Sequence, residues 1–421
     1  MGTVRFVHCA DLHLDTPFRG LSDVAPEVGE ALNKATFQSW DNIVDLAIRE
    51  QVDFIVIAGD VYDSSDRTLR AQFRFRDGLK RLAERGIPSF VAFGNHDPLS
   101  GWSNTLDWPE SVHAFGAGAV DSCPVIRDGL AVATVHGISY PKEAVTENLS
   151  RRFDRPETSL PSVAVLHANV GGDTAHLPYA PTTVEELSSR GFTYWALGHV
   201  HAHRILRADA PVIVYPGCSQ SRQPNETGAK GCCLVTLADG MLPEVRFVPT
   251  DVVRFHQGAV DVSRCDSIDA ARRAVIANCR SAADEADGRP LVARLSLTGR
   301  TDVHRQLARA GAVPELAADL REELLTLEPW IWLERLALDT RGAYDLDVQR
   351  QRQDFVGDII SIYDGLLARG PAELEQLREE IESDLSSWGG RRYLEPLPPG
   401  AVRELAEEAM RQTLDLVIAE D

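Results

Sequence analysis

The chain has 421 residues, 44% of them hydrophobic and 25% charged, a composition typical of an ordinary globular protein with two or three domains. Its formal net charge of −20 at pH 7 gives no support for a nucleic-acid partner, because phosphate binding favours a basic surface. No apolar stretch approaches the roughly 18 residues of a membrane span, and the first residues lead directly into a predicted strand, so we expect no membrane segment and no signal peptide.

The distribution of charge and of cysteines adds two expectations. Residues 350–421 contain 16 acidic residues against eight arginines, so much of the negative charge lies in a C-terminal segment. Seven cysteines, an odd number, are scattered without a Cys-x-x-Cys motif, which indicates free thiols in a reducing compartment. We therefore expect a cytoplasmic protein, in which Cys9 points into the core.

Residues 1–252 alternate between short apolar runs and longer amphipathic segments. The runs are rich in valine, isoleucine and aromatic residues, which is typical of buried strands. The segments Lys34–Glu50 and Leu69–Glu84 predict helices, and Gly86 and Pro88 end the second one. This alternation predicts an α/β layered domain with the strands at its centre. The predicted strands are Val4–His8, Phe54–Ala58, Ser89–Phe93, Leu130–His136, Val163–His167, Tyr194–Leu197, Val212–Tyr215 and Cys232–Leu237.

The pattern then changes to a small α+β unit over residues 253–345 and a helical tail over residues 346–421. The tail is acidic and amphipathic, and we expect breaks at Gly370-Pro371 and at Pro396–Gly400. The elements predicted in the α+β unit are the strands Phe255–Val262, Leu291–Leu297 and Trp330–Leu338 and the helices Ile268–Ala283 and Val303–Leu325.

Five short motifs of metal-ligating residue types each follow a predicted strand in the first 252 residues. Open α/β sheets bind their ligands at this edge. The motifs supply carboxylates, an amide and five imidazoles, and such donors without thiolates suit Mn, Fe or Zn. The motifs contain more donor side chains than one ion needs, which predicts a two-metal site suited to displacement at phosphorus. The motifs are Asp11-x-His13, Gly59-Asp60, Gly94-Asn95-His96-Asp97, His167 and Gly198-His199-Val200-His201.

The residue types indicate different roles within this site. Asp60 is the natural bridging ligand, since one carboxylate can bind two cations, and Asn95 offers a neutral oxygen. His96 can serve as a proton donor instead of a ligand. His199 and His201 lie on the same side of an extended segment and could reach different ions. Any one of these histidines alone is more often a core or surface residue, but their joint occurrence after strands favours the metal site.

Residues beside the motifs keep two interpretations open. They could support the ligands or contact the substrate, and they could equally be solvated loop residues. His203 continues the alternation after His201. The others are Asp15, Asp63, Arg67 and Asp97.

In this order, the motifs resemble those of calcineurin-like metallophosphoesterases, and more narrowly those of bacterial SbcD-type DNA repair exonuclease subunits. The first likeness extends from residue 4 to about residue 250. The second depends on Ala10–Phe18, Tyr215-Pro216-Gly217, the loop Arg222–Gly231 and the domain order. The resemblance implies an αββα sandwich with a small α+β cap domain, a possible DNA-binding surface, and a helical C-terminal tail.

The resemblance also implies two divalent metal ions, most often Mn²⁺, with Fe, Zn or Mg as other possibilities. The implied ligands are Asp11, His13, Asp60 and His201 for one ion and Asp60, Asn95, His167 and His199 for the other. His96 would be the acid that protonates or stabilises the leaving oxygen. The chain departs from archaeal and eukaryotic nucleases at Asp63, where they carry a histidine that helps to position the phosphate. We expect substrate contacts from Asp63, Arg67, Arg222 and His203.

The favoured hypothesis is a Mn²⁺-dependent DNA nuclease in DNA repair, a 3′–5′ exonuclease on duplex ends that could also cut single strands. The resemblance implies an SMC-like coiled-coil ATPase of the SbcC type as partner, and a homodimer. Val356–Leu367 and Ala401–Ile418 have the apolar spacing for docking on a coiled coil, and equally for packing on their own domain. Alternatives are a phosphatase or phosphodiesterase acting on small or protein substrates, and a catalytically silent adaptor for an ATPase.

Overall fold

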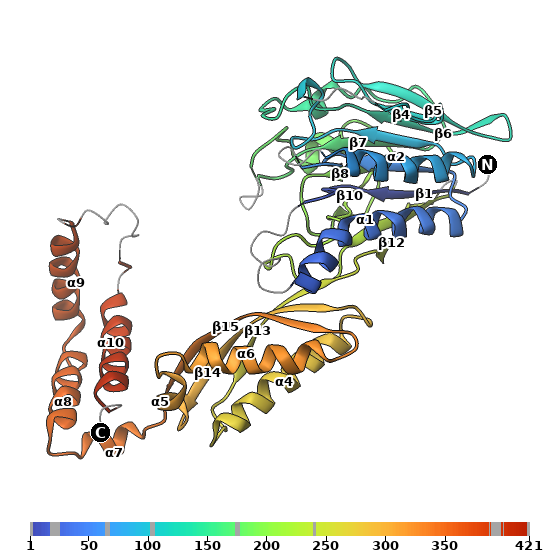
Figure 1. Cartoon of the computed structure of the whole chain (residues 1–421). Coiled ribbons are helices and arrows are strands. Elements are labelled where there is room, and N and C mark those ends of the chain that lie inside the picture. Colours follow the sequence, from blue (N-terminus) through green and yellow to red (C-terminus); the bar gives the residue numbers. More distant parts are fainter. Residues whose placement is uncertain are drawn as a thin grey trace. The chain divides into compact units, whose positions relative to one another are not determined.

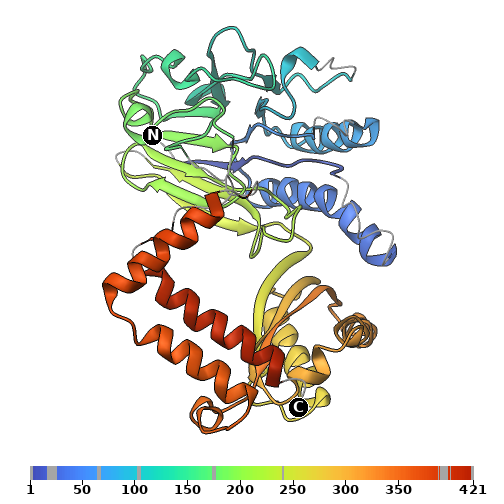
Figure 2. The same ribbon diagram turned by 90° about the vertical axis from the view of Figure 1, so that its left-hand side faces the viewer.

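The chain forms two compact units, which Figure 1 shows in one view and Figure 2 after a turn of 90°. The first contains residues 1–257, 281–294 and 324–334, and the second contains residues 258–280, 295–323 and 335–421. The predicted α+β unit is thus divided between them. The computed structural model describes residues 3–16, 26–63, 68–101, 106–172, 177–238, 241–386, 388, 397–398 and 400–418.

One six-stranded sheet of the first unit is built around parallel strands. Phe6 lies opposite Phe54, and Ile55 lies opposite Ser89. All of β2 (Phe54–Ala58) is buried, because its residues are apolar and parallel strands flank it on both sides. The strand order is β12 (Glu244–Pro249), β11 (Gly231–Leu237), β1 (Val4–Cys9), β2 (Phe54–Ala58), β3 (Ser89–Ala92) and β4 (Val112–Ala114).

Two helices cover the outer face of this sheet. They are α1 (Pro26–Arg49) and α2 (Leu69–Ala83), and their contact includes the rings of Trp40 and Phe75, whose centroids are 5.1 Å apart. α2 begins after Thr68, whose hydroxyl oxygen accepts the N–H of Ala71 and so caps the first turn. Cys9 packs in this core, as predicted.

A second six-stranded sheet lies against the first. The apolar layer between the sheets includes Phe6, Phe54 and Tyr194. The outer face packs Phe153 and Trp195 beneath loops, short 3-10 turns and the short helix α3 (Val184–Ser188). The strand order is β5 (Asp121–Arg127), β6 (Leu130–Gly137), β7 (Ser162–His167), β8 (Tyr194–Gly198), β10 (Val212–Tyr215) and β9 (Arg204–Arg207). The predicted α/β sandwich is confirmed, with only short helices in the layer over this sheet.

The eight strands predicted for residues 1–252 are all present, with ends shifted by at most one residue. The first helix begins at Pro26 instead of Lys34. Four strands were not predicted, namely β4, β5, β9 and β12. They lie at sheet edges or next to them and are mostly half-exposed or exposed, so they lack the continuous apolar runs that mark the central strands.

A three-stranded sheet follows, with α4 (Ile268–Asp284) between its first two strands in the chain. Its order is β13 (Arg254–Asp261), β14 (Leu291–Thr301) and β15 (Ile331–Gly342). The single helix predicted over Val303–Leu325 is wrong. The segment forms α5 (His304–Leu307) and α6 (Ala312–Leu325), because Gly311 between them adopts a φ of +87° that ends a helix.

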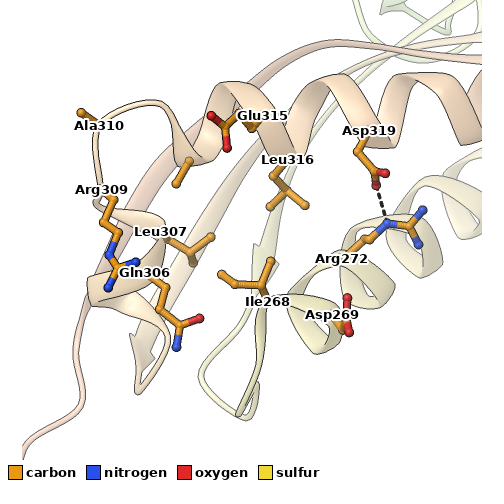
Figure 3. Close-up of a pocket in the computed structure, with 11 residues that line it drawn as sticks. Ile268, Asp269, Arg272, Gln306, Leu307, Arg309, Ala310, Glu315, Leu316 and Asp319 are labelled. Carbon is orange, nitrogen blue, oxygen red and sulfur yellow. Dashed lines mark hydrogen bonds and ion pairs between the residues drawn. The ribbon is translucent and has the colours of Figure 1, made fainter.

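A pocket of about 770 Å³ lies between α5 and the first turns of α4 and α6 (Figure 3). The side chains of Ile268, Leu307 and Leu316 point toward one another inside it, and Arg272 forms an ion pair with Asp319 at one side. None of the predicted metal ligands lines this pocket.

The C-terminal helices are α7 (Leu346–Arg350), α8 (Phe355–Leu367), α9 (Pro371–Ser386) and α10 (Ala401–Val417). α10 packs alongside α8 and α9 (Figure 2), and the contact with α8 buries Val356, Ile360, Met410 and Leu414. The break predicted at Gly370-Pro371 is confirmed. Within the described part of the chain, no helix is long and apolar enough to cross a membrane.

Candidate metal centre

The predicted ligands lie in loops at the carboxyl ends of strands from both sheets. The N–H of His199 donates to both carboxylate oxygens of Asp11, at 3.1 and 3.0 Å, which joins a loop of one sheet to a loop of the other. The predicted ligands are Asp11 and His13 after β1, Asp60 after β2, Asn95 after β3, His167 at the end of β7, and His199 and His201 after β8.

Asp60 occupies the centre of this cluster. Its Oδ2 lies 3.3 Å from His167 Nε2 and 3.9 Å from His13 Nε2, and its Oδ1 accepts the N–H of His96 at 3.0 Å. His167 Nε2 also lies 3.0 Å from Asn95 Oδ1. A carboxylate between two imidazoles is in the position that a bridging ligand needs.

Four groups of three described residues bring donor atoms close enough to share an ion, and two of these groups consist entirely of predicted ligands. In each group, one donor atom of every residue lies within 4.8 Å of the others. The other two groups are His13, Asp63 and His96, and His201, Cys218 and Glu226. The groups of predicted ligands are Asp11, His13 and His201, and Asp11, Asp60 and His167. These two groups together include predicted ligands of both ions, and Asp11 belongs to both groups.

His199 lies beside these groups. Its ring centroid is 5.2 Å from that of His167, and its Nε2 lies 2.8 Å from the carbonyl oxygen of Leu177. Nδ1 is therefore the ring nitrogen with which His199 would bind an ion.

His13 shows that the residues present fit a metal ion. Its ring is completely buried, and among the described residues neither ring nitrogen has a hydrogen-bond partner. Asp63 Oδ1 is 3.5 Å from Nδ1, too far for a good hydrogen bond. Burial and then the charge of Arg222 lower the pKa of His13 to about 3. The ring is therefore neutral, which is the form that binds metals.

The electrostatics of the buried cluster also favour cations. Burial alone would lower the pKa of His167, but the charges of Asp60 and Asp11 raise it to about 9. His201 shows a further feature of metal-binding imidazoles, because its Nδ1 lies 2.7 Å from a carboxylate oxygen of Glu226. Such a carboxylate fixes the ring orientation of a ligand.

The backbone around the cluster is strained at four candidate ligands. Asp11, His13, Asp60 and His199 have φ angles of 50°, 42°, 53° and 108°. Residues other than glycine rarely adopt positive φ, and such strain concentrates at functional sites. The fold therefore holds these side chains in positions that the local backbone does not favour.

Glycines of the motifs allow the loops to approach one another. A Cβ on Gly94 would lie 2.3 Å from Asp60 Oδ1, and one on Gly198 would lie 1.9 Å from the carbonyl oxygen of Ala58. No side chain fits at either distance. The glycine of each motif is therefore required by close packing against a ligand or its strand.

His96 belongs to a separate pair at the edge of the cluster. Its Nδ1 lies 2.8 Å from Asp63 Oδ1, and Arg222 donates to Asp63 Oδ2 at 2.9 Å. Burial alone would lower the pKa of His96, but the hydrogen bond to Asp63 and the charges of Asp60 and Asp63 raise it above its usual value. His96 is thus the histidine best able to carry a proton.

Two further residues support the candidate ligands: Asp97, for which the sequence left a supporting role open, and Glu226, for which it predicted no such role. Asp97 is completely buried and accepts the N–H groups of Val61 at 2.6 Å, Tyr62 at 3.3 Å and Gly94 at 2.7 Å, so it ties the loop after β2 to the loop after β3. Glu226 orients His201. Asp97 is the last residue of the motif Gly94-Asn95-His96-Asp97, whereas no local pattern marks Glu226.

Two predicted substrate contacts are not in the cluster as described. Arg67 lies outside the described residues. His203 is turned away: its Nδ1 lies 3.1 Å from the carbonyl oxygen of Tyr215, and its ring stacks on Phe247 at 4.7 Å. No contact joins His203 to the clustered ligands among the residues that the structure describes. His203 lies two residues after His201, as the alternation requires, but its ring packs on Phe247 of β12 at the edge of the first sheet.

Comparison with known proteins places the chain among phosphoesterases. Residues 4–203 match the family model "Calcineurin-like phosphoesterase", and residues 255–341 match "Metallophosphoesterase YhaO, middle domain". The uncharacterized metallophosphoesterase YhaO of Bacillus subtilis is 35% identical over 341 residues, which are 81% of this chain and 83% of that protein.

Two more distant relatives have names that include DNA repair or nuclease activity. The DNA double-strand break repair protein Mre11 of Sulfurisphaera tokodaii is 28% identical over 60% of this chain and 64% of that protein. A subunit of the nuclease SbcCD of Bacillus subtilis is 26% identical over 56% of this chain and 67% of that protein. From the long match to YhaO and the matching family model, the chain belongs to the calcineurin-like metallophosphoesterase family, whose members are metal-dependent hydrolases with a dinuclear centre.

Proposed function

We propose that the chain is a DNA nuclease that hydrolyses phosphodiesters at this centre with two divalent ions. The observation that carries the proposal is His13, a completely buried and neutral imidazole whose ring nitrogens have no hydrogen-bond partner among the described residues. It lies between carboxylates and other imidazoles, which is the environment of a metal ligand. The names of the Mre11 and SbcCD relatives support DNA as the substrate.

The proposed ligands are those that the motifs indicated. Asp11, His13, Asp60 and His201 would hold one ion, and Asp60, Asn95, His167 and His199 would hold the other. Oxygen and imidazole donors suit Mn²⁺, and also Fe, Zn or Mg. When bound, the ions supply an activated water and neutralise charge on the phosphate.

The remaining chemistry belongs to side chains of the chain itself. With Nδ1 held by Asp63, His96 would deliver a proton from Nε2 to the leaving oxygen. Asp63 orients the ring and favours its charged form. Asp97 and Glu226 hold the loops so that these groups keep their positions when substrate enters.

We further propose 3′–5′ exonuclease action on duplex ends, with cleavage of single strands as a second activity, inside a cytoplasmic repair complex. An SMC-like coiled-coil ATPase is the proposed partner, and a second copy of the chain is proposed to form a homodimer. The proposed domains are residues 1–252 for catalysis, 253–345 as a cap and 346–421 for docking. The separate match of residues 255–341 supports the first of these boundaries.

An exposed apolar stripe on α8 supports the docking proposal. Phe355 and Ile362 are 68% and 70% exposed, although the opposite face of the same helix is buried against α10. Large apolar side chains at helical spacing on an open face are typical of helix docking.

A phosphodiesterase acting on another substrate is the second candidate function. It is favoured by the long match to YhaO, a metallophosphoesterase whose name includes no substrate. The match covers four fifths of this chain, more than any match to the Mre11 or SbcCD relatives cited above.

The test is Mn²⁺-dependent digestion of end-labelled duplex DNA, compared with bis-p-nitrophenyl phosphate and p-nitrophenyl phosphate. Wild type and His96→Ala are assayed with and without the candidate ATPase. We expect DNA degradation that the substitution abolishes. Hydrolysis of the small esters with DNA untouched under all conditions would establish the second candidate. Metal binding without hydrolysis of any substrate would indicate an adaptor.

A further inference from the structure

Arg222 is an enclosed arginine at the candidate centre with little of its donor capacity used. Its side chain is only 10% exposed, and among the described residues Asp63 is the one acceptor for its guanidinium group. Nε is buried without a hydrogen-bond partner. A guanidinium group carries five N–H donors in a fixed fork, and leaving buried donors unpaired is unfavourable. The natural complement of this group is an anion with several oxygens.

The loop that carries Arg222 is fixed to the centre. The N–H of Arg222 donates to Glu226 Oε2 at 2.6 Å, and the other oxygen of Glu226 lies 2.7 Å from His201 Nδ1. The hydroxyl of Ser221 donates to the carbonyl oxygen of Glu226 at 2.7 Å. One carboxylate therefore positions both a candidate ligand and the start of the arginine side chain. A group held in this way needs little rearrangement to bind an anion.

Arg222 lies on a defined side of the proposed acid. Asp63 uses one oxygen for His96 Nδ1 and the other for Arg222. The proton for the leaving oxygen would come from Nε2, at the opposite edge of the imidazole ring. In this series of contacts, the carboxylate and the imidazole ring lie between the Arg222 guanidinium group and His96 Nε2. The scissile phosphate would be held by the two ions, so Arg222 is placed for an anion farther along the leaving fragment.

We infer that Arg222 binds a second phosphate, one nucleotide beyond the scissile bond on the leaving-group side, and thereby selects polynucleotides over isolated phosphodiesters. This inference rests on the proposed nuclease function. Arginine suits the role, because its planar fork can form two parallel hydrogen bonds with phosphate oxygens.

The test compares the dinucleotide TpT with pTpT, which has an added 5′-phosphate, and with TpTp, which has an added 3′-phosphate. In 3′–5′ cleavage the leaving oxygen is O3′ of the first nucleoside, so only the phosphate of pTpT lies on the leaving side. We expect wild type to prefer pTpT over TpT in kcat/KM by about tenfold, the scale of one charge-assisted hydrogen bond. Arg222→Gln should reduce this ratio to about one, and Arg222→Lys should keep part of it.

Arg246→Gln is the matched control, since Arg246 is an exposed arginine paired with Glu50, and its ratio should equal that of wild type. Bound metal and melting temperature show whether each variant is folded. Equal hydrolysis of TpT and pTpT by wild type overturns the inference, and so does a preference that persists in Arg222→Gln. A ratio for TpTp that depends on Arg222 overturns the assignment to the leaving side. Hydrolysis of bis-p-nitrophenyl phosphate without cleavage of any dinucleotide or DNA would instead reject the nuclease function, and the inference with it.

Discussion

At the scale of single residues, two neighbouring histidines are set for opposite tasks. The ring centroids of His13 and His96 are 5.0 Å apart, yet burial and Arg222 lower the pKa of the first to about 3, whereas Asp63 and Asp60 outweigh burial and raise the pKa of the second. Groups whose surroundings separate their pKa values in this way commonly have different catalytic roles. These opposite shifts support the proposal that His13 binds metal and that His96 transfers a proton.

This assignment predicts different losses for two substitutions. His96→Ala should keep both ions and lose about 10²- to 10⁴-fold in kcat, the usual contribution of a general acid. Asp60→Ala should lose metal at both positions, because Asp60 Oδ2 lies 3.9 Å from His13 Nε2 and 3.3 Å from His167 Nε2, and these two histidines are proposed ligands of different ions. Metal content after dialysis and turnover of bis-p-nitrophenyl phosphate measure the two effects. Normal turnover by His96→Ala would contradict the assignment.

Gly94 provides a second test at this scale. In Gly94→Ala, the added methyl group would lie 2.3 Å from Asp60 Oδ1, so Asp60 must move and metal affinity should fall by at least tenfold, an order-of-magnitude estimate for a displaced ligand. Gly118→Ala is the matched control, because nothing lies within 4 Å of its new Cβ. Calorimetric titration with Mn²⁺ measures both affinities. Equal affinities in the two variants would show that the loop can relax around the methyl group.

At the scale of elements, the site depends on loops that are joined by buried side chains. β2 and β3 are parallel neighbours, and the segments after them are tied by Asp97, which accepts three backbone N–H groups. Burial and the charge of Asp60 raise the pKa of Asp97 to about 7, but the N–H donors favour its charged form. The carboxylate of Asp97 therefore holds the loops after β2 and β3 together next to the candidate ligands.

Removing this clamp should destabilise the first unit as well as the site. Asp97→Ala leaves three buried N–H groups without their acceptor, and we expect a loss of roughly 2 to 4 kcal/mol in the free energy of unfolding. Urea unfolding followed by fluorescence measures the loss. Asp154→Ala, a substitution at an exposed loop residue of the same unit, serves as the comparison. A loss of less than 1 kcal/mol for Asp97→Ala, an order-of-magnitude limit, would mean that water replaces the carboxylate.

At the scale of the whole molecule, bound metal should contribute to stability. Asp11 and Asp60 are completely buried, and cations that bind only the folded chain shift the unfolding equilibrium by mass action. Mn²⁺ should therefore raise the melting temperature of wild type relative to a chelator by several degrees, an order-of-magnitude expectation. The shift should vanish in Asp60→Ala. Differential scanning calorimetry measures it, and equal shifts in both proteins would place the bound metal elsewhere.

The exposed stripe of α8 leads to a separate prediction for the proposed complex. Ile362→Glu should abolish binding to an SMC-like ATPase, because a charge would replace an exposed apolar contact, whereas metal-dependent turnover should stay at the wild-type level. Ser361→Glu, on the same helix and also exposed, adds the same charge next to the stripe. Analytical ultracentrifugation of the mixed proteins measures the association. Unchanged binding by Ile362→Glu would exclude this face.

The extent to which local patterns predict the structure differs between its parts. Val212–Tyr215 was predicted with its observed ends, since an apolar run this short, with Pro211 before it and Pro216-Gly217 after it, favours a buried strand over a helix. β9 and β12 were missed, because half-exposed strands gain their stability from the neighbour to which they pair. The prediction of one helix over Val303–Leu325 was wrong, because the positive φ of Gly311 interrupts the segment although its apolar periodicity is helical.

In the candidate site too, some features could be predicted from the sequence and others could not. Its ligand types could be recognised along the chain, because each follows a strand within a short motif and parallel strands bring such loops to one edge. The partners of these residues could not be predicted. Asp63 meets Arg222 across 159 positions, and Asp11 meets His199 across 188. Short-range pattern specifies which chemistry a loop can offer. Hydrogen bonds between distant loops form only when the two sheets pack, and they give His13 and His96 the different surroundings on which their proposed roles depend.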